Sequence, residues 1–271
     1  MKNTTLIFNF ILLIIFSSCK ENQTTKNEEL KDTQEKEEVT IVTDDIKLTK
    51  LQNSPKFKNA KLQMIAPETN TLEAGDNIFS FQVENYKLGV PTENAQDLGL
   101  ANSKKGQHVH FILNNNPYSA HYEEQFSKNL EAGEHTVLAF LSRSYHESVK
   151  NKNAFVLKKL SVGEIKPENQ LDINLNNPHM FYSRPKGSYS GKDNERILLD
   201  FYLVNANLSK EEYKIKAKIN GQEFIITEWA PYLIEGLKMG ENTIELNFLD
   251  KDNNMVASPY NPVKRTIILE E

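Results

Sequence analysis

Short alternating runs of apolar and polar residues dominate the chain from Lys56 onward. Clear examples are residues 78–83, 109–113, 136–141 and 243–249. Alternation with a period of two, bounded by Gly, Asn and Pro, is typical of β-strands with one buried face. No long apolar stripe with the 3.6-residue helical period occurs, so the pattern predicts helices that are few and short.

The alternating part also repeats itself weakly. Leu130-Glu-Ala-Gly133-Glu-His-Thr-Val137 aligns with Leu237-Lys-Met-Gly240-Glu-Asn-Thr-Ile244, and residues 79–85 resemble residues 199–205. Two pairs of similar segments in the same order along the chain indicate two related structural modules. The strand and turn spacing predicts an all-β fold of two immunoglobulin-like β-sandwich domains in tandem, and one continuous sandwich is the alternative.

These two domains are expected at residues 56–165 and 166–271, after a polar N-terminal segment. Residues 20–38 contain almost no apolar side chains, so they cannot bury enough surface to offset the entropy of ordering. We therefore predict a disordered, charged tether at residues 19–55.

The N-terminus itself carries an apolar segment, residues 6–16, preceded by Lys2. This organisation predicts a secretory signal peptide at residues 1–18, and the segment is shorter than the roughly 20 residues that span a bilayer. The chain's single cysteine, Cys19, follows directly.

The tetrad Phe16-Ser-Ser-Cys19 resembles the lipobox of bacterial lipoproteins. The resemblance implies cleavage before Cys19 and acylation of its thiol, whereas an ordinary signal peptide is the alternative. The implied protein is anchored in the cell envelope by lipid. Because Lys20 rather than Asp follows the cysteine, the resemblance favours the outer membrane.

Charge and motif content narrow the classes of function. The net charge is −5 with both signs interspersed, which gives no reason to expect nucleic-acid binding. With Cys19 acylated, no thiol is left for a disulfide, an Fe–S cluster or a nucleophile. The sequence has no Gly-x-Ser-x-Gly, Walker A or His-Glu-x-x-His motif, so we expect no enzyme, and a hydrolase ranks last.

Histidines are concentrated in the first module, where five of the six lie. His108 and His110 flank Val109, and residues two apart on a strand point to the same face. Val109, Phe111 and Leu113 then form the opposite, core-facing row. Two imidazoles on one face are suited to hold one Zn or Cu ion.

A third ligand would have to come from another segment. His146 and His121 are the candidates, with Glu147 or Glu123 as oxygen donors. The alternative is that the histidines only satisfy hydrogen bonds. We expect that structural role for His135, which occupies the turn position where the second module has Asn242.

The segments Gly106-Gln-His108-Val-His110, Gly133-Glu-His135-Thr136 and Tyr145-His146 resemble a His-rich secreted bacterial domain of unknown function, over residues about 60–165. The resemblance implies that these four histidines correspond to recurring histidines of that family. It implies no activity. The family often has three consecutive histidines where this chain has Val109, and Pro where this chain has Ala132.

A second resemblance concerns Ser142-Arg143-Ser-Tyr-His146, which is similar to the Ser-Arg-x-His element of forkhead-associated phosphopeptide-binding domains. It implies that Ser142, Arg143 and His146 bind a phosphothreonine, since guanidinium groups suit phosphate. The spacing here has one extra residue. The family's upstream Gly-Arg pair is absent from the first module, whose only arginine is Arg143.

The second module offers three weaker features. Residues 182–193 form a polar segment with Tyr, Arg and Lys that is suited to an anion or a sugar, or is a plain loop. Trp229, beside Tyr232, is a core aromatic or a carbohydrate-stacking platform. Asn220-Gly221 predicts a tight hairpin.

The sequence thus favours a lipid-anchored, non-enzymatic binding protein of the cell envelope with a Zn or Cu site in its first domain. The alternatives are a structural or partner-binding component of a surface complex, with another envelope protein as partner, and a phosphopeptide-binding module.

Overall fold

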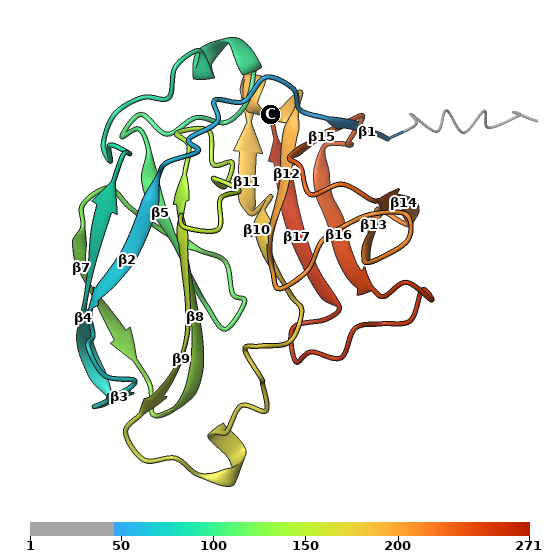
Figure 1. Ribbon diagram of the computed structural model, residues 1–271. Helices are drawn as coiled ribbons and strands as arrows, with labels where there is room; N and C mark the ends of the chain where they lie inside the picture. The colour runs from blue at the N-terminus through green and yellow to red at the C-terminus, as the bar shows by residue number, and fades with distance from the viewer. Residues whose placement is uncertain (1–45) are drawn as a thin grey trace, which may run out of the picture. The chain divides into compact units, whose positions relative to one another are not determined.

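The computed structural model describes residues 46–271, which form β-strands joined by loops and three short 3₁₀ helices, Ala95–Leu98, Pro167–Asn169 and Gly191–Asn194 (Figure 1). No α-helix occurs in this range. The predicted all-β class is therefore confirmed. No helix of the described part is long and apolar enough to cross a membrane. The signal peptide, Cys19 and the first part of the tether lie outside the described residues.

Two sheets form the first sandwich, with strand orders β2-β4-β7 and β3-β9-β8-β5-β6. Their strands are β2 (Lys61–Ala66), β3 (Thr71–Leu72), β4 (Gly75–Glu84), β5 (His108–Leu113), β6 (Ser119–His121), β7 (Gln125–Leu130), β8 (Gly133–Ser142) and β9 (Phe155–Val162). Neighbours are antiparallel except that β3 runs parallel to β9.

The second sandwich has the strand orders β1-β15-β12-β10 and β11-β17-β16-β13-β14. Its strands are β1 (Lys47–Lys50), β10 (His179–Arg184), β11 (Gly187–Ser190), β12 (Ile197–Val204), β13 (Lys214–Ile219), β14 (Gln222–Ile226), β15 (Tyr232–Glu235), β16 (Gly240–Leu249) and β17 (Val263–Glu270). Strand β11 runs parallel to β17, and the other pairs are antiparallel.

Apart from β1, the two sandwiches share one connectivity, which is that of the immunoglobulin-like fold. In each sandwich, the first strand (β2 or β10) is followed by a short strand in the other sheet (β3 or β11). This short strand runs parallel to the last strand of the sandwich (β9 or β17). The repeated sequence segments lie on equivalent strands, because β8 begins at Gly133 and β16 begins at Gly240. The Asn220-Gly221 hairpin joins β13 and β14 as predicted.

Each sandwich encloses its own apolar core. Val109 and Phe111 are buried with Phe79, Phe81 and Leu141 in the first, which confirms the inward-facing row. The second core is built by residues of β10, β12, β13, β16 and β17. Burial of these side chains is the main favourable term in the stability of both sandwiches.

A third apolar cluster joins the two sandwiches. Ile112 and Phe140, on β5 and β8, pack with Phe181 and Tyr202, on β10 and β12. The rings of Phe140 and Tyr202 stack with centroids 4.7 Å apart. Strand β5 is therefore buried on both faces: the alternation that turns Val109 inward turns His108, His110 and Ile112 toward the second sandwich.

Strand β1 corrects the predicted end of the tether. The sequence pattern assigned residues up to 55 to a disordered segment, but Lys47–Lys50 pairs antiparallel with β15 of the second sandwich. Ile46 is buried in the second core and Leu48 packs against it. The strand contains one apolar residue, Leu48, and Ile46 directly precedes it. This signal is too short to stand out from the charged segment before it.

The chain passes from one sandwich to the other between Val162 and His179. This connection includes residues 165 and 166, where the two predicted domains meet. The third cluster packs residues of both sandwiches together, and the described residues belong to one compact unit.

Candidate metal centre

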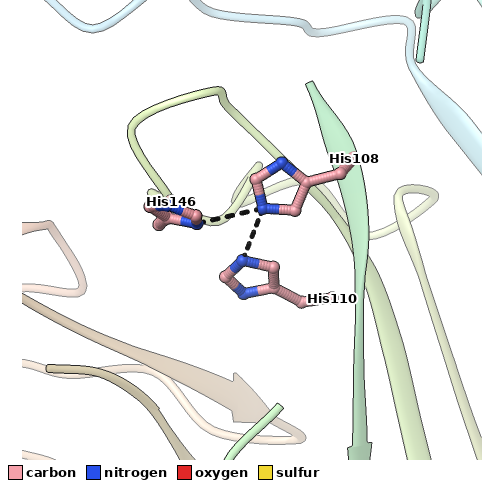
Figure 2. Close-up of side chains that lie close together, drawn as sticks. All are labelled: His108, His110 and His146. Carbon is pink, nitrogen blue, oxygen red and sulfur yellow. Dashed lines mark hydrogen bonds between the residues drawn. The ribbon is translucent and has the colours of Figure 1, made fainter. Parts of the chain in front are cut away.

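Three imidazoles converge between the two sandwiches, as Figure 2 shows. The Nε2 atom of His108 lies 2.8 Å from Nε2 of His110 and 3.1 Å from Nδ1 of His146. One ring nitrogen from each histidine lies within 4.8 Å of the other two. The structure thus brings together three of the four predicted metal ligands.

The positions of these side chains follow from local structure. His108 and His110 lie two residues apart on β5 and share the face that is turned to the second sandwich. His146 lies in the β8–β9 connection in a left-handed conformation with φ 71°. Such a conformation is uncommon for a residue other than glycine and is often found at functional sites.

Hydrogen bonds to the remaining ring nitrogens orient two of the imidazoles. Nδ1 of His108 lies 2.8 Å from the carbonyl oxygen of Gly106. A carbonyl only accepts hydrogen bonds, so this nitrogen carries the proton and Nε2 of neutral His108 presents a lone pair. Nδ1 of His110 lies 3.3 Å from Oγ of Ser183, on β10. Such secondary contacts orient metal-binding histidines.

The lone pair of His108 faces two ring nitrogens at once. His110 and His146 are both within hydrogen-bonding distance of the same Nε2 atom, yet one nitrogen lone pair accepts only one good hydrogen bond. A protein network of three neutral imidazoles leaves one of these contacts unsatisfied. A cation that accepts a lone pair from each ring satisfies all three, which makes a metal ion the better match to this arrangement.

Burial keeps the three rings neutral. His108 and His110 are fully buried and His146 is partly buried. Burial lowers the pKa of His108 to about 4, and it lowers the pKa of both His110 and His146 well below the ordinary histidine value. The positive charges of Arg184 and Lys186 act in the same direction. Neutral imidazole is the form that binds metal.

The spacing suits a small transition-metal ion. Ligand nitrogens at 2.0–2.1 Å around a tetrahedral zinc ion lie about 3.3 Å from one another. Two of the three separations here, 2.8 and 3.1 Å, are within about half an ångström of that value. The residues therefore fit Zn, and Cu, which also accepts imidazole.

Several groups around the centre were not predicted as part of it. The ring of Tyr118 stacks on His110 with centroids 3.5 Å apart, and its hydroxyl lies 3.1 Å from Nδ1 of His146. Ser183, Arg184 and Lys186 come from the polar segment at residues 182–193. This segment is not a plain loop, because it includes the end of β10 and all of β11.

His121, the other predicted third ligand, lies elsewhere. It pairs with Val109 across β5 and β6, so it faces the first core. Its ring stacks on Phe126 with centroids 3.3 Å apart, and Nε2 lies 2.8 Å from Oγ of Ser119. Glu123 is exposed and outside the cluster.

Glu147, the other predicted oxygen donor, has internal partners instead. It forms a buried ion pair with Arg143 at 3.1 Å and accepts a hydrogen bond from Tyr145. The Arg143 guanidinium also donates to the carbonyl oxygens of Pro55 and Ser148.

These contacts bear on the phosphopeptide alternative. Arg143 is 4% exposed and Ser142 is fully buried. The donors of Arg143 are directed to protein acceptors, so neither side chain is presented to a phosphate. The Ser-Arg pair instead fixes the base of the connection that holds His146.

The turn histidine has the structural role that was expected of it. Nε2 of His135 lies 2.9 Å from the carbonyl oxygen of Glu131, four residues earlier. In the second sandwich, Asn242 donates to the carbonyl oxygen of Lys238 at 2.7 Å, also four residues earlier. A hydrogen-bonding side chain at this turn position explains both residues.

Trp229 is anchored rather than free. Its indole Nε1 donates to the carbonyl oxygen of Phe201 at 3.0 Å, and its ring packs edge-on against Tyr202. The half-buried ring also lines a cleft of about 440 Å³ between residues 50–58 and the β8–β9 connection. A core role accounts for most of its contacts.

Comparisons with known proteins assign no family. No family model matches the chain, and no curated protein matches it in sequence. Among solved structures, the fibronectin(III)-like modules of Clostridium thermocellum CbhA are 14% identical, with a TM-score of 0.27 over 77% of this chain and 94% of theirs. Bacteroides ovatus SGBP-B, solved with a mixed-linkage heptasaccharide, is 11% identical, with a TM-score of 0.23 over 78% of this chain and 47% of that one. The central fibronectin-III array of RIM-binding protein is 9% identical, with a TM-score of 0.26 over 81% and 70%. At these scores the likenesses carry no inference about ligand or activity.

Proposed function

We propose that this protein is a non-enzymatic binding protein that holds a Zn or Cu ion through His108, His110 and His146. The observation that carries the proposal is the convergence of three neutral imidazole nitrogens, two of them facing one lone pair. Three donors of the same kind leave at least one coordination position for a further ligand.

The surroundings of the centre favour holding an ion over transforming a substrate. His108 and His110 are fully buried between the sandwiches, and the ligands come from a strand and a tightly bonded connection. A site enclosed in this way is suited to retain a metal ion, for storage, transfer or to stabilise the junction of the two sandwiches.

Zinc and copper differ in how tightly they bind to nitrogen donors. Both bind imidazole, and the Irving–Williams order favours copper at a site of nitrogen donors. Among the described residues the cluster consists of three histidines, without a thiolate or a carboxylate. We therefore expect Cu(II) to bind more tightly than Zn(II), with the metal available in the compartment deciding which ion is found.

We further propose that the protein is exported and anchored to the cell envelope, by acylation of Cys19, with the outer membrane as the location that Lys20 favours. The support is the sequence pattern of residues 1–20. Mass spectrometry of the mature N-terminus after expression in a Gram-negative host tests this. We expect the mature chain to begin at Cys19 with two or three acyl chains on it. An unmodified Cys19 thiol, or a chain that still begins at Met1, overturns the proposal.

Isothermal titration calorimetry with Zn(II) and Cu(II) tests the metal centre. His146→Asn removes the imidazole while asparagine accepts the left-handed backbone, and His108→Asn removes a second ligand. His121→Asn is the matched control, because it removes a histidine of the same sandwich that lies outside the cluster.

We expect wild type and H121N to bind one ion per chain with similar affinity. H146N and H108N should bind it at least about 100-fold more weakly, since even secondary partners of a metal site contribute 10–100-fold. Equal affinity in H146N, H108N and H121N would remove the site.

A further inference from the structure

Two positive side chains next to the metal centre have no acidic partner among the residues that the structure describes. Arg184, on β10, is 8% exposed; its Nη1 donates to the hydroxyl of Tyr189 at 2.8 Å, and its buried Nε has no hydrogen-bond partner among the described residues. Lys186 donates to the carbonyl oxygen of Tyr118 at 2.6 Å. Within residues 46–271, no carboxylate lies within ion-pair distance of either cation.

Tyr118 connects these cations to the histidines. Its ring stacks on His110 with centroids 3.5 Å apart, and Nζ of Lys186 lies 3.9 Å from the centroid of the same ring. The Arg184 guanidinium lies 5.5 Å from that centroid. The Tyr118 hydroxyl is 3.1 Å from Nδ1 of His146. The two cations and two of the three imidazoles, those of His110 and His146, therefore lie around one tyrosine.

Nothing in this arrangement supplies negative charge. The side chains beside the two cations are the phenols of Tyr118 and Tyr189, and no carboxylate of the described residues is among them. Burial lowers the pKa of Lys186 to about 8, with the positive charge of Arg184 acting in the same direction. A buried charge without a counter-charge is costly, and a bound divalent cation adds repulsion at short range.

We propose that the centre takes a small anion as its further ligand, bound beside Tyr118, where Arg184 and Lys186 supply positive charge. The class is a monovalent anion with a donor atom for the metal, such as a carboxylate, a halide, a pseudohalide or hydroxide. The metal side of the inference rests on the proposed function. The anion side stands by itself, because the two unpaired cations are part of the protein without the ion.

The anion explains three observations together. It neutralises Arg184, which otherwise has only a phenol as partner; it completes the coordination that three histidines leave open; and it reduces the repulsion between the metal and two neighbouring cations. Metal and anion should therefore bind cooperatively, each raising the affinity for the other.

The test uses Co(II) as the metal and azide as the anion. The visible absorption of Co(II) reports its coordination, so azide binding to the metal-loaded protein is followed by titration. We expect azide to change the spectrum and to raise the Co(II) affinity. Lys186→Gln should weaken azide binding about tenfold, as loss of a charge-assisted contact does, whereas the matched control Lys218→Gln, an exposed lysine on β13, should bind azide as wild type does.

A second arm uses the metal-free protein, prepared with a chelator that is then removed. Azide should raise the thermal unfolding midpoint of wild type and K218Q, and raise that of K186Q less. An unaltered Co(II) spectrum in protein that binds Co(II), or equal azide affinity in K186Q and wild type, overturns the anion site. Protein that binds no Co(II) but is stabilised by azide through Lys186 overturns the proposed metal function and supports the anion site.

Discussion

Asp200, on β12 of the second sandwich, accepts hydrogen bonds from both the backbone N–H and the hydroxyl of Ser148, two residues after His146 of the first. The carboxylate is fully buried and also pairs with Lys150 at 2.5 Å. One side chain of the second sandwich thus fixes the connection that carries a candidate metal ligand. The relative placement of the sandwiches and the geometry of the centre depend on each other.

Replacing Asp200 by alanine should affect both stability and metal binding. Removing one member of a buried ion pair leaves Lys150 and the Ser148 N–H without their partner, so we expect the free energy of unfolding to fall by about 3 kcal/mol. Metal affinity should fall about tenfold, as for other orienting partners. Urea unfolding and calorimetry measure the two effects.

The control for D200A is Asp252→Ala, which removes an exposed carboxylate paired with Lys251. Its free energy of unfolding should change by less than about 1 kcal/mol. Unchanged metal affinity in D200A would show that the connection holds His146 in place without help from the second sandwich.

Stability should fall as the pH is lowered from about 7 to 4 in the presence of a chelator. Histidines of the unfolded chain take up protons near pH 6.5, but burial holds the pKa of His108 at about 4 and those of His110 and His146 well below the usual value. The unfolded state then binds more protons, so each histidine reduces the free energy of unfolding by up to about 1.4 kcal/mol per pH unit.

H146N identifies the source of this dependence. It carries one fewer depressed histidine, so its free energy of unfolding should decrease less steeply than that of wild type below about pH 6, by up to about 1.4 kcal/mol per pH unit. Urea unfolding at a series of pH values measures both slopes. Identical slopes would assign the pH dependence to other groups.

Arg143 should contribute to stability and not to phosphopeptide binding. Arg143→Gln leaves Glu147 buried without its ion-pair partner, so we expect the free energy of unfolding to fall by about 3 kcal/mol. Lys61→Gln, which breaks an exposed pair with Glu84, should cost less than about 1 kcal/mol. In fluorescence anisotropy, wild type should bind no phosphothreonine peptide; binding that R143Q loses would restore the phosphopeptide alternative.

Local pattern was enough to predict most of the fold. Alternation with period two placed the strands and the inward row of Val109 and Phe111, and the turn at Gly133 and Gly240 indicated two related modules. These features depend on residues close in sequence, where the strand period and turn chemistry act directly. The short strand β1 was missed because its partner β15 is far away along the chain.

The candidate centre was only partly predictable for the same reason. His108 and His110 are two residues apart on one strand, so their shared face follows from the strand period. His146 and His121 were equal candidates, because nothing local tells which connection folds back toward β5. Ser183, Arg184 and Lys186 lie near the centre because the second sandwich packs on the first. The periodicity of the sequence does not predict this packing.

Removing β1 should weaken the second sandwich. A chain that lacks residues 1–50 loses the buried side chain of Ile46 and the cover of the β15 edge, whereas a chain that lacks residues 1–42 keeps both. We expect the shorter chain to be about 3 kcal/mol less stable to urea. It should also self-associate in sedimentation velocity through the exposed edge; equal stability and a monomer in both would contradict this.

Pairing of Leu48 with Ile234 also sets an order of events during synthesis. Among the described strands β1 leaves the ribosome first, and it cannot pair until β15 has emerged. The first sandwich, which lies between them in the chain, has time to fold in the meantime. Capture of that early segment is thus a long-range step, the slow kind in β proteins. A nascent chain that ends before Tyr232 would contain the folded first sandwich and a β1 strand without its partner β15.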